Sequence, residues 1–303
     1  MTLLPVSVVI PLYNHEKYIV DTLESVFIQS SSPAEVIVVD DGSIDKSASI
    51  IRDYSRNRSE LIFWSQPNQG AHQAINSGIH RATNDYVAIL NSDDAYHCQR
   101  LEKCVDILQT DPEISVVATE IDFMNDKGKI IKNSWYDQAR SNYKETGDLG
   151  LALMNGNFIM TTSNFVLRRT LFEEAGYFAP LRYAHDLEFL LRLIFLGKKI
   201  HIIKEKLLTY RVHQKNTISE DHKKVRVEWA FCCAGFIWMT DFKKHGESKG
   251  WVYLEKMAAI MDKHNLTKLV LYFLSYFQES SSNKNLWLCL ADDDFFDFIY
   301  KVS

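Results

Sequence analysis

The chain has 303 residues, of which 46% are hydrophobic and 24% are charged. These proportions are typical of a soluble globular protein, and the length allows one large domain or two ordinary ones, so disorder of the whole chain is not expected. The formal net charge of −5 argues against a nucleic-acid partner, because binding a phosphate backbone depends on a positively charged surface.

The five cysteines form an odd number, and no two of them have C-x-x-C spacing; they are Cys98, Cys104, Cys232, Cys233 and Cys289. This pattern favours neither a disulfide framework nor a zinc site, and it fits a reducing cytosol. The N-terminal residues lack a basic segment followed by a long apolar one, and no run reaches the roughly 18 apolar residues that a spanning helix needs. We therefore expect a cytoplasmic protein that is not integral to a membrane.

Short apolar runs alternate with amphipathic segments through the first 120 residues. The runs that predict strands are Val6 to Ile10, Glu35 to Val39, Leu61 to Trp64 and Tyr86 to Leu90. The segments that predict helices are Ile19 to Phe27, Asp45 to Tyr54, Ala71 to Ala82 and Arg100 to Thr110. This alternation is typical of βαβ units and predicts an α/β fold with a mostly parallel central sheet flanked by helices.

From about Val116 the pattern loosens into polar sequence, which we interpret as a variable loop region. Regular periodicity returns further along. The expected elements are a strand over Thr162 to Arg168, a short helix over Leu171 to Ala175, a helix over Asp186 to Leu196, and strands over Ile200 to Ile203 and Leu207 to Val212. The two helices are closed by Gly176 and Gly197, as helix C-termini commonly are. We expect one domain over residues 1–218.

Beyond Ile218 the sequence becomes aromatic and helical in period, which predicts a helical C-terminal extension over residues 219–303. Its expected helices are Trp229 to Met239, Trp251 to Met261 and Lys268 to Phe277. The apolar stripes fit either buried helix packing, the commoner cause, or a surface for a partner or for peripheral contact with the inner face of the cytoplasmic membrane. The run Asp292 to Asp294 is interpreted as a helix start rather than a metal site.

Pairs of acidic residues follow two of the predicted strands. Asp40 and Asp41 follow the second strand, and Asp93 and Asp94 follow the fourth. Because parallel strands end at the same edge of a sheet, these pairs are expected to lie on one side, where open α/β sheets bind ligands. Adjacent carboxylates repel each other unless a hard cation bridges them to an anion such as a diphosphate. Ordinary turn and N-cap chemistry is the alternative for Asp93 and Asp94.

The loop after the first strand contains no glycine. A dinucleotide-binding Rossmann domain needs G-x-G-x-x-G there, whereas this chain has Pro11-Leu12-Tyr13-Asn14-His15, so pyridine-nucleotide chemistry is disfavoured. An aromatic ring at Tyr13 and a carboxylate at Asp41 suit a nucleobase, since one can stack on the base and the other can accept its N–H. Ordinary packing remains the alternative for Tyr13.

Several short blocks occur in an order typical of one family. They are Val8-Val9-Ile10-Pro11-Leu12-Tyr13-Asn14, Val38-Val39-Asp40-Asp41-Gly42-Ser43, Asn68-Gln69-Gly70 with Ala74, Asn76 and Gly78, Asn91-Ser92-Asp93-Asp94, His185-Asp186, and Tyr210-Arg211-Val212-His213. Over roughly Val6 to Ile218 the chain resembles the inverting nucleotide-sugar glycosyltransferases of family 2, which have the GT-A fold. Each block is weak by itself, but the ordered set is specific.

The resemblance implies roles for individual residues. A nucleotide site, most often for uracil, is implied for Pro11, Tyr13, Asn14, Asp41, Asn68, Gly70 and Asn76. Asp93 would contact the ribose or the metal shell, and Asp94 would bind Mg²⁺ or Mn²⁺. Asp186 stands where the family has its catalytic base. Arg211 and His213 match a late loop over the diphosphate, with His213 also a metal ligand; a surface histidine in a turn is the alternative for His213.

Two positions depart from the family pattern. His185 stands where an acidic residue is common, which would alter acceptor contacts or the pKa of Asp186. Ile75 stands where a basic residue is common, and this weakens the case for diphosphate binding unless His72 or Arg81 compensates.

The resemblance implies an enzyme that moves a sugar from a nucleotide-diphosphate donor, with UDP favoured, to a hydroxyl of a glycan or lipid-linked glycan in bacterial surface polysaccharide synthesis. Two alternatives remain open at this point. A sugar nucleotidyltransferase uses a similar sheet but carries a glycine-rich basic loop after the first strand, which this chain lacks. A non-catalytic nucleotide-sugar or glycan-binding module would leave Asp186 without a task.

Overall fold

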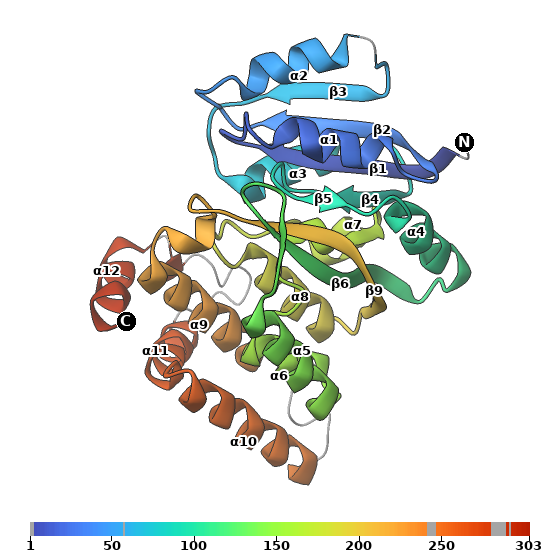
Figure 1. The fold of residues 1–303 in the computed structure, drawn as a ribbon. Helices are drawn as coiled ribbons and strands as arrows, with labels where there is room; N and C mark the ends of the chain where they lie inside the picture. The colour runs from blue at the N-terminus through green and yellow to red at the C-terminus, as the bar shows by residue number, and fades with distance from the viewer. Residues whose placement is uncertain (1–2, 57, 241–246, 280–288, 291) are drawn as a thin grey trace. The chain divides into compact units, whose positions relative to one another are not determined.

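The computed structural model describes residues 3–56, 58–240, 247–279, 289–290 and 292–303. The chain divides into two compact units, which are described separately. The first comprises Met1–Asn133, Ile159–Phe178 and Lys198–His213, and the second comprises Ser134–Phe158, Ala179–Gly197 and Gln214–Ser303. The first unit is α/β and the second is helical (Figure 1). The predicted boundary at residue 218 stays a prediction.

The first unit is built on one sheet with the strand order β3-β2-β1-β4-β8-β6-β9-β5, and β7 pairs with β6. Its strands are β1 (Leu3–Leu12), β2 (Ser32–Asp40), β3 (Leu61–Ser65), β4 (Tyr86–Ile89), β5 (Ala95–Tyr96), β6 (Ile114–Asn125), β7 (Ile130–Ile131), β8 (Val166–Arg168) and β9 (Lys199–Val212). Its helices are α1 (Ile19–Phe27), α2 (Ser47–Ser55), α3 (Ala71–Arg81), α4 (Arg100–Thr110), α7 (Leu171–Ala175) and the 3₁₀ turn η1 (Thr162–Asn164). These bounds confirm the α/β architecture and the first four predicted strands and helices.

Most of the sheet is parallel. β1 is parallel to β2 and to β4, and β2 is parallel to β3. β8 is antiparallel to both β4 and β6, so β6 runs in the same direction as β4, and β9 is parallel to β6. The carboxyl ends of β1, β2, β4, β6 and β9 therefore lie at one edge. β2 and β3 lie on one side of β1, whereas β4 lies on its other side. The strand order therefore reverses between β1 and β4, and sheets of this kind bind ligands at such a point.

Close packing between α3 and β1 requires a glycine at residue 78. A methyl group built on Gly78 would overlap the side chain of Val9 and touch that of Val39. Both valines are fully buried in the sheet. The strands read as continuous apolar runs because they are covered on both faces, as is usual for parallel sheets.

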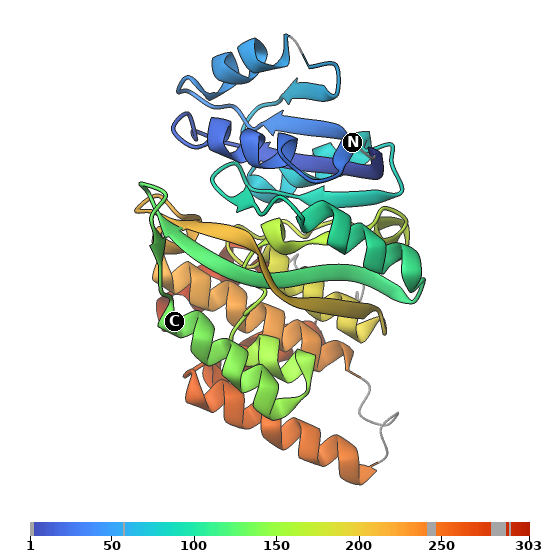
Figure 2. The same ribbon diagram turned by 45° about the vertical axis from the view of Figure 1, so that its right-hand side comes forward.

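The region after Val116 was expected to be loop, and this expectation is wrong. Its first part is β6, which pairs with β9 over most of its length. Figure 2 shows the two long strands running side by side, β6 in green and β9 in orange. The predicted strands Ile200 to Ile203 and Leu207 to Val212 are one strand, with register irregularities beside Glu120 where the polar residues of β9 interrupt the apolar pattern.

Two helices, α5 (Ser134–Thr146) and α6 (Leu149–Asn155), occupy the rest of that region and belong to the second unit. The strand predicted over Thr162 to Arg168 is present only over its last three residues, Val166–Arg168, which form β8. Its first part is the turn η1, in which the Thr161 side chain accepts a hydrogen bond from the Ser163 N–H. Local side-chain hydrogen bonds of this kind compete with strand pairing.

The described residues of the second unit form helices and no strand. Besides α5 and α6 they are α8 (His185–Phe195), the 3₁₀ turn η2 (Thr217–Ser219), α9 (His222–Met239), α10 (Glu247–Lys263), α11 (Thr267–Glu279) and α12 (Asp293–Val302). The aromatic stripes of α9 and α11 pack against each other, with the ring centroids of Phe231 and Phe273 5.6 Å apart. Buried packing thus accounts for these stripes.

The start of α12 agrees with the interpretation of its acidic run. The Asp292 side chain accepts a hydrogen bond from the Phe295 N–H and caps the helix. Among the described residues, no helix combines the length and apolar character that crossing a bilayer requires.

Replacing Gly78 by alanine is expected to lower the free energy of unfolding by about 1–3 kcal/mol, because the added methyl group overpacks the contact with Val9. The gain in helix propensity, about 1 kcal/mol, offsets only part of this strain. The matched control is Ser77→Ala at the neighbouring, partly exposed position, which should change stability by about 0.5 kcal/mol or less. Urea denaturation measures both, and an unchanged stability of Gly78→Ala would contradict the packing argument.

Candidate active site

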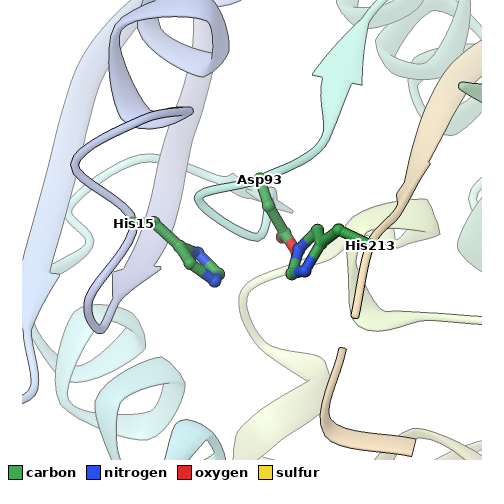
Figure 3. A group of neighbouring side chains, drawn as sticks. All are labelled: His15, Asp93 and His213. Atoms are coloured by element: carbon green, nitrogen blue, oxygen red, sulfur yellow. The ribbon is translucent and has the colours of Figure 1, made fainter. Parts of the chain in front are cut away.

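Three loops at the carboxyl edge of the sheet bring a carboxylate and two imidazoles together. His15 follows β1, Asp93 follows β4 and His213 follows β9. One potential ligand atom from each lies within 4.8 Å of the others. Figure 3 shows the three side chains pointing toward one another. We call this group the His-Asp-His cluster.

The cluster is held by hydrogen bonds and by aromatic packing. His213 Nε2 lies 2.9 Å from Asp93 Oδ2, and His15 Nδ1 lies 2.8 Å from Ser92 Oγ. The Tyr18 ring stacks on the His213 ring, with centroids 5.0 Å apart and planes inclined by 24°. These contacts restrict the rotation of both imidazoles, which prepares the cluster for a ligand.

Asp93 is suited to carry a negative charge. Burial by itself would raise the pKa of this carboxyl, but the hydrogen bond with His213 and the charges of His15 and His213 outweigh burial and lower the pKa below its usual value. Asp93 is therefore a carboxylate at neutral pH, available to a cation.

Asp94 does not belong to the cluster. Its Oδ2 accepts a hydrogen bond from Ser163 Oγ at 2.6 Å and its Oδ1 accepts one from the backbone N–H of Arg211 at 2.9 Å. Burial, followed by repulsion from Asp93, raises the pKa of Asp94 well above its usual value. The metal-ligand role expected for Asp94 stays a prediction, and in this structure the oxygens of Asp94 contact Ser163 and Arg211, whereas Asp93 lies with the two histidines.

Arg211 lies within β9 rather than in a loop. Its side chain is only 3% exposed, and its Nε donates to the backbone carbonyl of Asp93 at 2.7 Å. The guanidinium also lies 4.8 Å from the centre of the Tyr18 ring and 3.3 Å from the Asp21 carboxylate. In this arrangement Arg211 supports the loop that carries Asp93.

Asp41 organises the loop before α3. Its carboxylate accepts hydrogen bonds from Gln66 Nε2 and from the backbone N–H groups of Gln69 and Gly70, at 2.8–3.2 Å. Each oxygen accepts two of these four contacts and Asp41 is buried, so the carboxylate is occupied by the loop that it holds. Gly70, at φ +89°, starts α3 in a backbone conformation that favours glycine.

The other residues expected at the nucleotide differ in exposure. Tyr13 is 44% exposed and Asn68 is exposed, whereas Pro11 is buried within β1. The Asn14 backbone N–H donates to Ser43 Oγ, and its side-chain oxygen accepts from the Ile44 N–H, which joins the loops after β1 and β2. Tyr13 is thus available for stacking, and Asn14 shapes the loop.

Asn76 is occupied by other parts of the protein. Its amide donates to the Phe178 carbonyl at 3.0 Å and accepts from the Phe178 N–H at 3.1 Å. These two buried hydrogen bonds join α3 to the segment after α7, so in this structure the Asn76 side chain stabilises the contact between them.

Asp186 belongs to the second unit, in the first turn of α8. Its Oδ1 accepts from the Leu187 N–H and its Oδ2 accepts from Asn157 Nδ2, both at 2.8 Å. Burial raises the pKa of Asp186 to about 7, the hydrogen bonds from Leu187 and Asn157 partly offset burial, and the charge of Glu228 adds to the increase. A carboxylate with a pKa near neutrality matches the needs of a general base.

Sequence reasoning missed His15, Ser163, Asn157 and Glu228. The signal for His15 was present, because it follows β1 at the same edge as the acidic residues that follow β2 and β4. No local signal marks the other three, since their partners are 29 to 69 residues away in the chain.

The donor set of the cluster fits a divalent cation. Two imidazole nitrogens and a carboxylate oxygen suit a first-row transition metal better than Mg²⁺, which prefers oxygen ligands. The Asp93 charge and the fixed orientation of the His213 ring are what such a site requires.

The fold is that of GT-A nucleotide-sugar transferases. The sequence profile of glycosyl transferase family 2 matches residues 7–176, so the chain belongs to that family of sugar-transferring enzymes. The expected fold class and family are confirmed.

Curated relatives agree with this assignment. An uncharacterised glycosyltransferase of Nostoc sp. is 32% identical over 220 residues, covering 70% of this chain and 66% of the relative. The putative glycosyltransferase EpsH of Bacillus subtilis is 30% identical, covering 73% and 64%. Chondroitin synthase of Escherichia coli is 30% identical, covering 70% and 29%. The matched region thus spans slightly less than two thirds of the first two relatives.

Solved structures share the fold. S. aureus TarS in complex with UDP-GlcNAc has a TM-score of 0.59 at 20% identity, covering 77% of this chain and 66% of that chain. Another TarS structure has a TM-score of 0.56 at 18% identity and covers 99% of this chain and 90% of that one. The second match extends the likeness to the C-terminal helices.

Replacing Asp93 by asparagine is expected to weaken Mn²⁺ binding about tenfold or more, because the cluster loses its charged ligand. Asp94→Asn is the comparison variant: Asp94 lies outside the cluster, so its loss of Mn²⁺ affinity should be smaller. Circular dichroism establishes that this variant is folded, because Ser163 Oγ already accepts from the Asn91 N–H and from Thr161 Oγ1 and the new amide loses that contact. Isothermal titration of Mn²⁺ into each variant tests this. A larger loss in Asp94→Asn than in Asp93→Asn would return the ligand role to Asp94.

Proposed function

We propose that the protein is a Mn²⁺-dependent inverting glycosyltransferase that moves a sugar from a nucleotide-diphosphate donor, with UDP as the nucleotide, to a hydroxyl acceptor. The observation that carries this proposal is the His-Asp-His cluster at the strand-order reversal between β1 and β4. In an α/β sheet this is the place for a phosphate-bearing ligand.

His15, Asp93 and His213 would hold the cation, which supplies Lewis-acid stabilisation of the charge on the departing diphosphate. The exposed Tyr13 ring would stack on the nucleobase, and a base N–H would reach Asp41 by displacing the Gln66 amide. The nucleotide contacts expected for Asn68 and Gly70 belong to the same proposal.

Asp186 would remove the proton from the attacking hydroxyl. Its pKa of about 7 leaves a substantial carboxylate fraction at neutral pH, together with enough basicity to accept a proton. Asn157 Nδ2 and the Leu187 N–H fix the carboxylate so that one orientation is presented to the acceptor. Attack from the face opposite the leaving group gives inversion, as with the base of inverting glycosidases.

The acceptor class is a glycan or a lipid-linked glycan. Support comes from the relatives, one of which is named chondroitin synthase. TarS has been crystallised with UDP and with UDP-GlcNAc, which supports a UDP-sugar donor for this fold. The cytoplasm, with contact at the inner face of its membrane, is the corresponding proposed location.

A donor screen tests the proposal as a whole. The protein is incubated with UDP-GlcNAc, other UDP-sugars and sugars on other nucleotides, and release of the nucleoside diphosphate is measured with Mn²⁺, with Mg²⁺ and with EDTA. We expect release from at least one UDP-sugar, faster with Mn²⁺ than with Mg²⁺ because of the two imidazoles, and none with EDTA. Release of pyrophosphate would instead identify a nucleotidyltransferase, and binding without release a non-catalytic module.

Asp186→Asn is expected to keep donor binding and to lower kcat about 10²- to 10⁴-fold, because the base is lost. The fold should survive, since a turned Asn157 amide can accept from the new amide group.

The pH profile provides a second measure of the same residue. The carboxylate form is the active one and burial raises its pKa to about 7, so kcat of the unmodified enzyme should rise as the pH increases through that value. Initial rates measured across the pH range check this, and a rate that is flat across pH 7 would remove Asp186 from the base role.

A further inference from the structure

The turn that leads into α8 is held by a carboxylate from another helix. Three successive backbone N–H groups, those of Arg182, Tyr183 and Ala184, donate to the Glu228 side chain of α9. The distances are 2.9 Å to Oε1 and 2.7 and 2.9 Å to Oε2. Glu228 is buried, and both of its oxygens are used.

This arrangement replaces a missing helix cap. Ala184 is the N-cap of α8, and it has no side chain that could accept a hydrogen bond. Successive backbone N–H groups form a concave anion-binding site, which here is filled by Glu228. Cys232, one turn further along α9, places its Sγ 3.6 Å from the Ala184 carbonyl oxygen. Glu228 thus accepts from the Ala184 N–H, and Cys232, on the same face of α9, donates to the Ala184 carbonyl.

Asp186 lies two residues after this N-cap, so a shift of the turn moves its carboxylate. Glu228 also acts through its charge; burial raises the pKa of Glu228 itself, and the three N–H groups and the charge of Arg182 offset part of this increase. Burial raises the pKa of Asp186, hydrogen bonds lower it, and the charge of Glu228 raises it further. From α9, Glu228 and Cys232 interact electrostatically with Asp186. On α8 its ionisable neighbours in sequence are His185 and Glu188, and α6 has no ionisable residue. Glu188 and Arg192 form an ion pair at 2.8 Å, which compensates the charge of Glu188.

We propose that Glu228 is a positioning residue for Asp186: it fixes the turn over residues 182–184 that leads into the first turn of α8, and its negative charge acts on the Asp186 carboxylate. The kinetic consequence rests on the proposed function of Asp186, but the effect on its titration does not.

A titration without substrate tests the charge. The Asp186 carboxyl is followed by NMR in protein with isotope-labelled aspartate, and its signal is assigned by its loss in Asp186→Asn. In Glu228→Gln the midpoint should move to lower pH, because a like charge has been removed. The matched control is Glu220→Gln, which removes a charge that binds the exposed Arg182 guanidinium beside the same turn. The control should leave the midpoint in place.

The kinetic test uses UDP-GlcNAc with Mn²⁺ and water as the acceptor. Glu228→Gln should lower kcat about 10- to 100-fold with little change in KM, since misplacement of a base by a fraction of an ångström to an ångström has effects of this size. In the pH profile of Glu228→Gln, the fall of kcat on the acidic side should also move to lower pH. Glu228→Asp keeps the charge but shortens the side chain, so it should lower kcat while the acidic side of its pH profile stays closer to that of the unmodified enzyme.

The outcomes separate this inference from the proposed function. An unmoved Asp186 midpoint in folded Glu228→Gln, with Asp186→Asn inactive, would overturn the inference alone. The same shift in Glu220→Gln as in Glu228→Gln would also overturn it, because any nearby charge would then suffice. Full turnover of Asp186→Asn would overturn the base role and the kinetic part, whatever the titration shows. Circular dichroism and thermal unfolding of each variant establish that it is folded.

Discussion

The buried carboxylate of Asp94 is the constraint on which the candidate metal site depends. It accepts hydrogen bonds from Ser163 in η1 and from the Arg211 backbone in β9, and the Asp94 carbonyl accepts one from Thr22 in α1. β5 begins at the next residue and pairs with β9. A charged or unpaired carboxyl would be costly here, but a hydrogen-bonded carboxyl with a raised pKa is tolerated.

Because Asp94 sets the position of β9 relative to the loop after β4, it determines what its neighbour Asp93 meets. Arg211 donates to the Asp93 carbonyl, and two residues later His213 reaches the Asp93 carboxylate. Tyr18 supports both Arg211 and His213 with its ring. The pKa of Asp93 is lowered and that of Asp94 is raised because different side chains and backbone groups surround these two adjacent residues.

The same residue type takes opposite pKa directions in the two units. Asp93 and Asp186 are both buried, which favours the neutral acid, but the imidazoles of His15 and His213 favour the carboxylate at Asp93 and no cation does so at Asp186 among the causes of its shift. A low pKa suits a metal ligand, and a pKa near 7 suits a base. When the surroundings move the pKa values of two carboxyl groups in opposite directions, the two groups suit different chemical tasks in one protein.

The sequence by itself determined the elements whose signals are local. The helices at Ala71–Arg81 and Arg100–Thr110 and the strands β1 to β4 follow from hydrophobic periodicity within about ten residues, and the ordered motif blocks identified the family and the sheet edge. The long pairing of β6 with β9 was missed, because strand pairing depends on a partner that lies far along the chain and polar residues interrupt the β9 pattern. Only the tertiary structure distinguished the surroundings of Asp93 from those of Asp94, since their partners Ser163, Arg211 and His213 lie 69 to 120 residues away. The same holds for Glu228, because an acidic residue on a helix gives no sign in sequence that three backbone N–H groups of another segment converge on it.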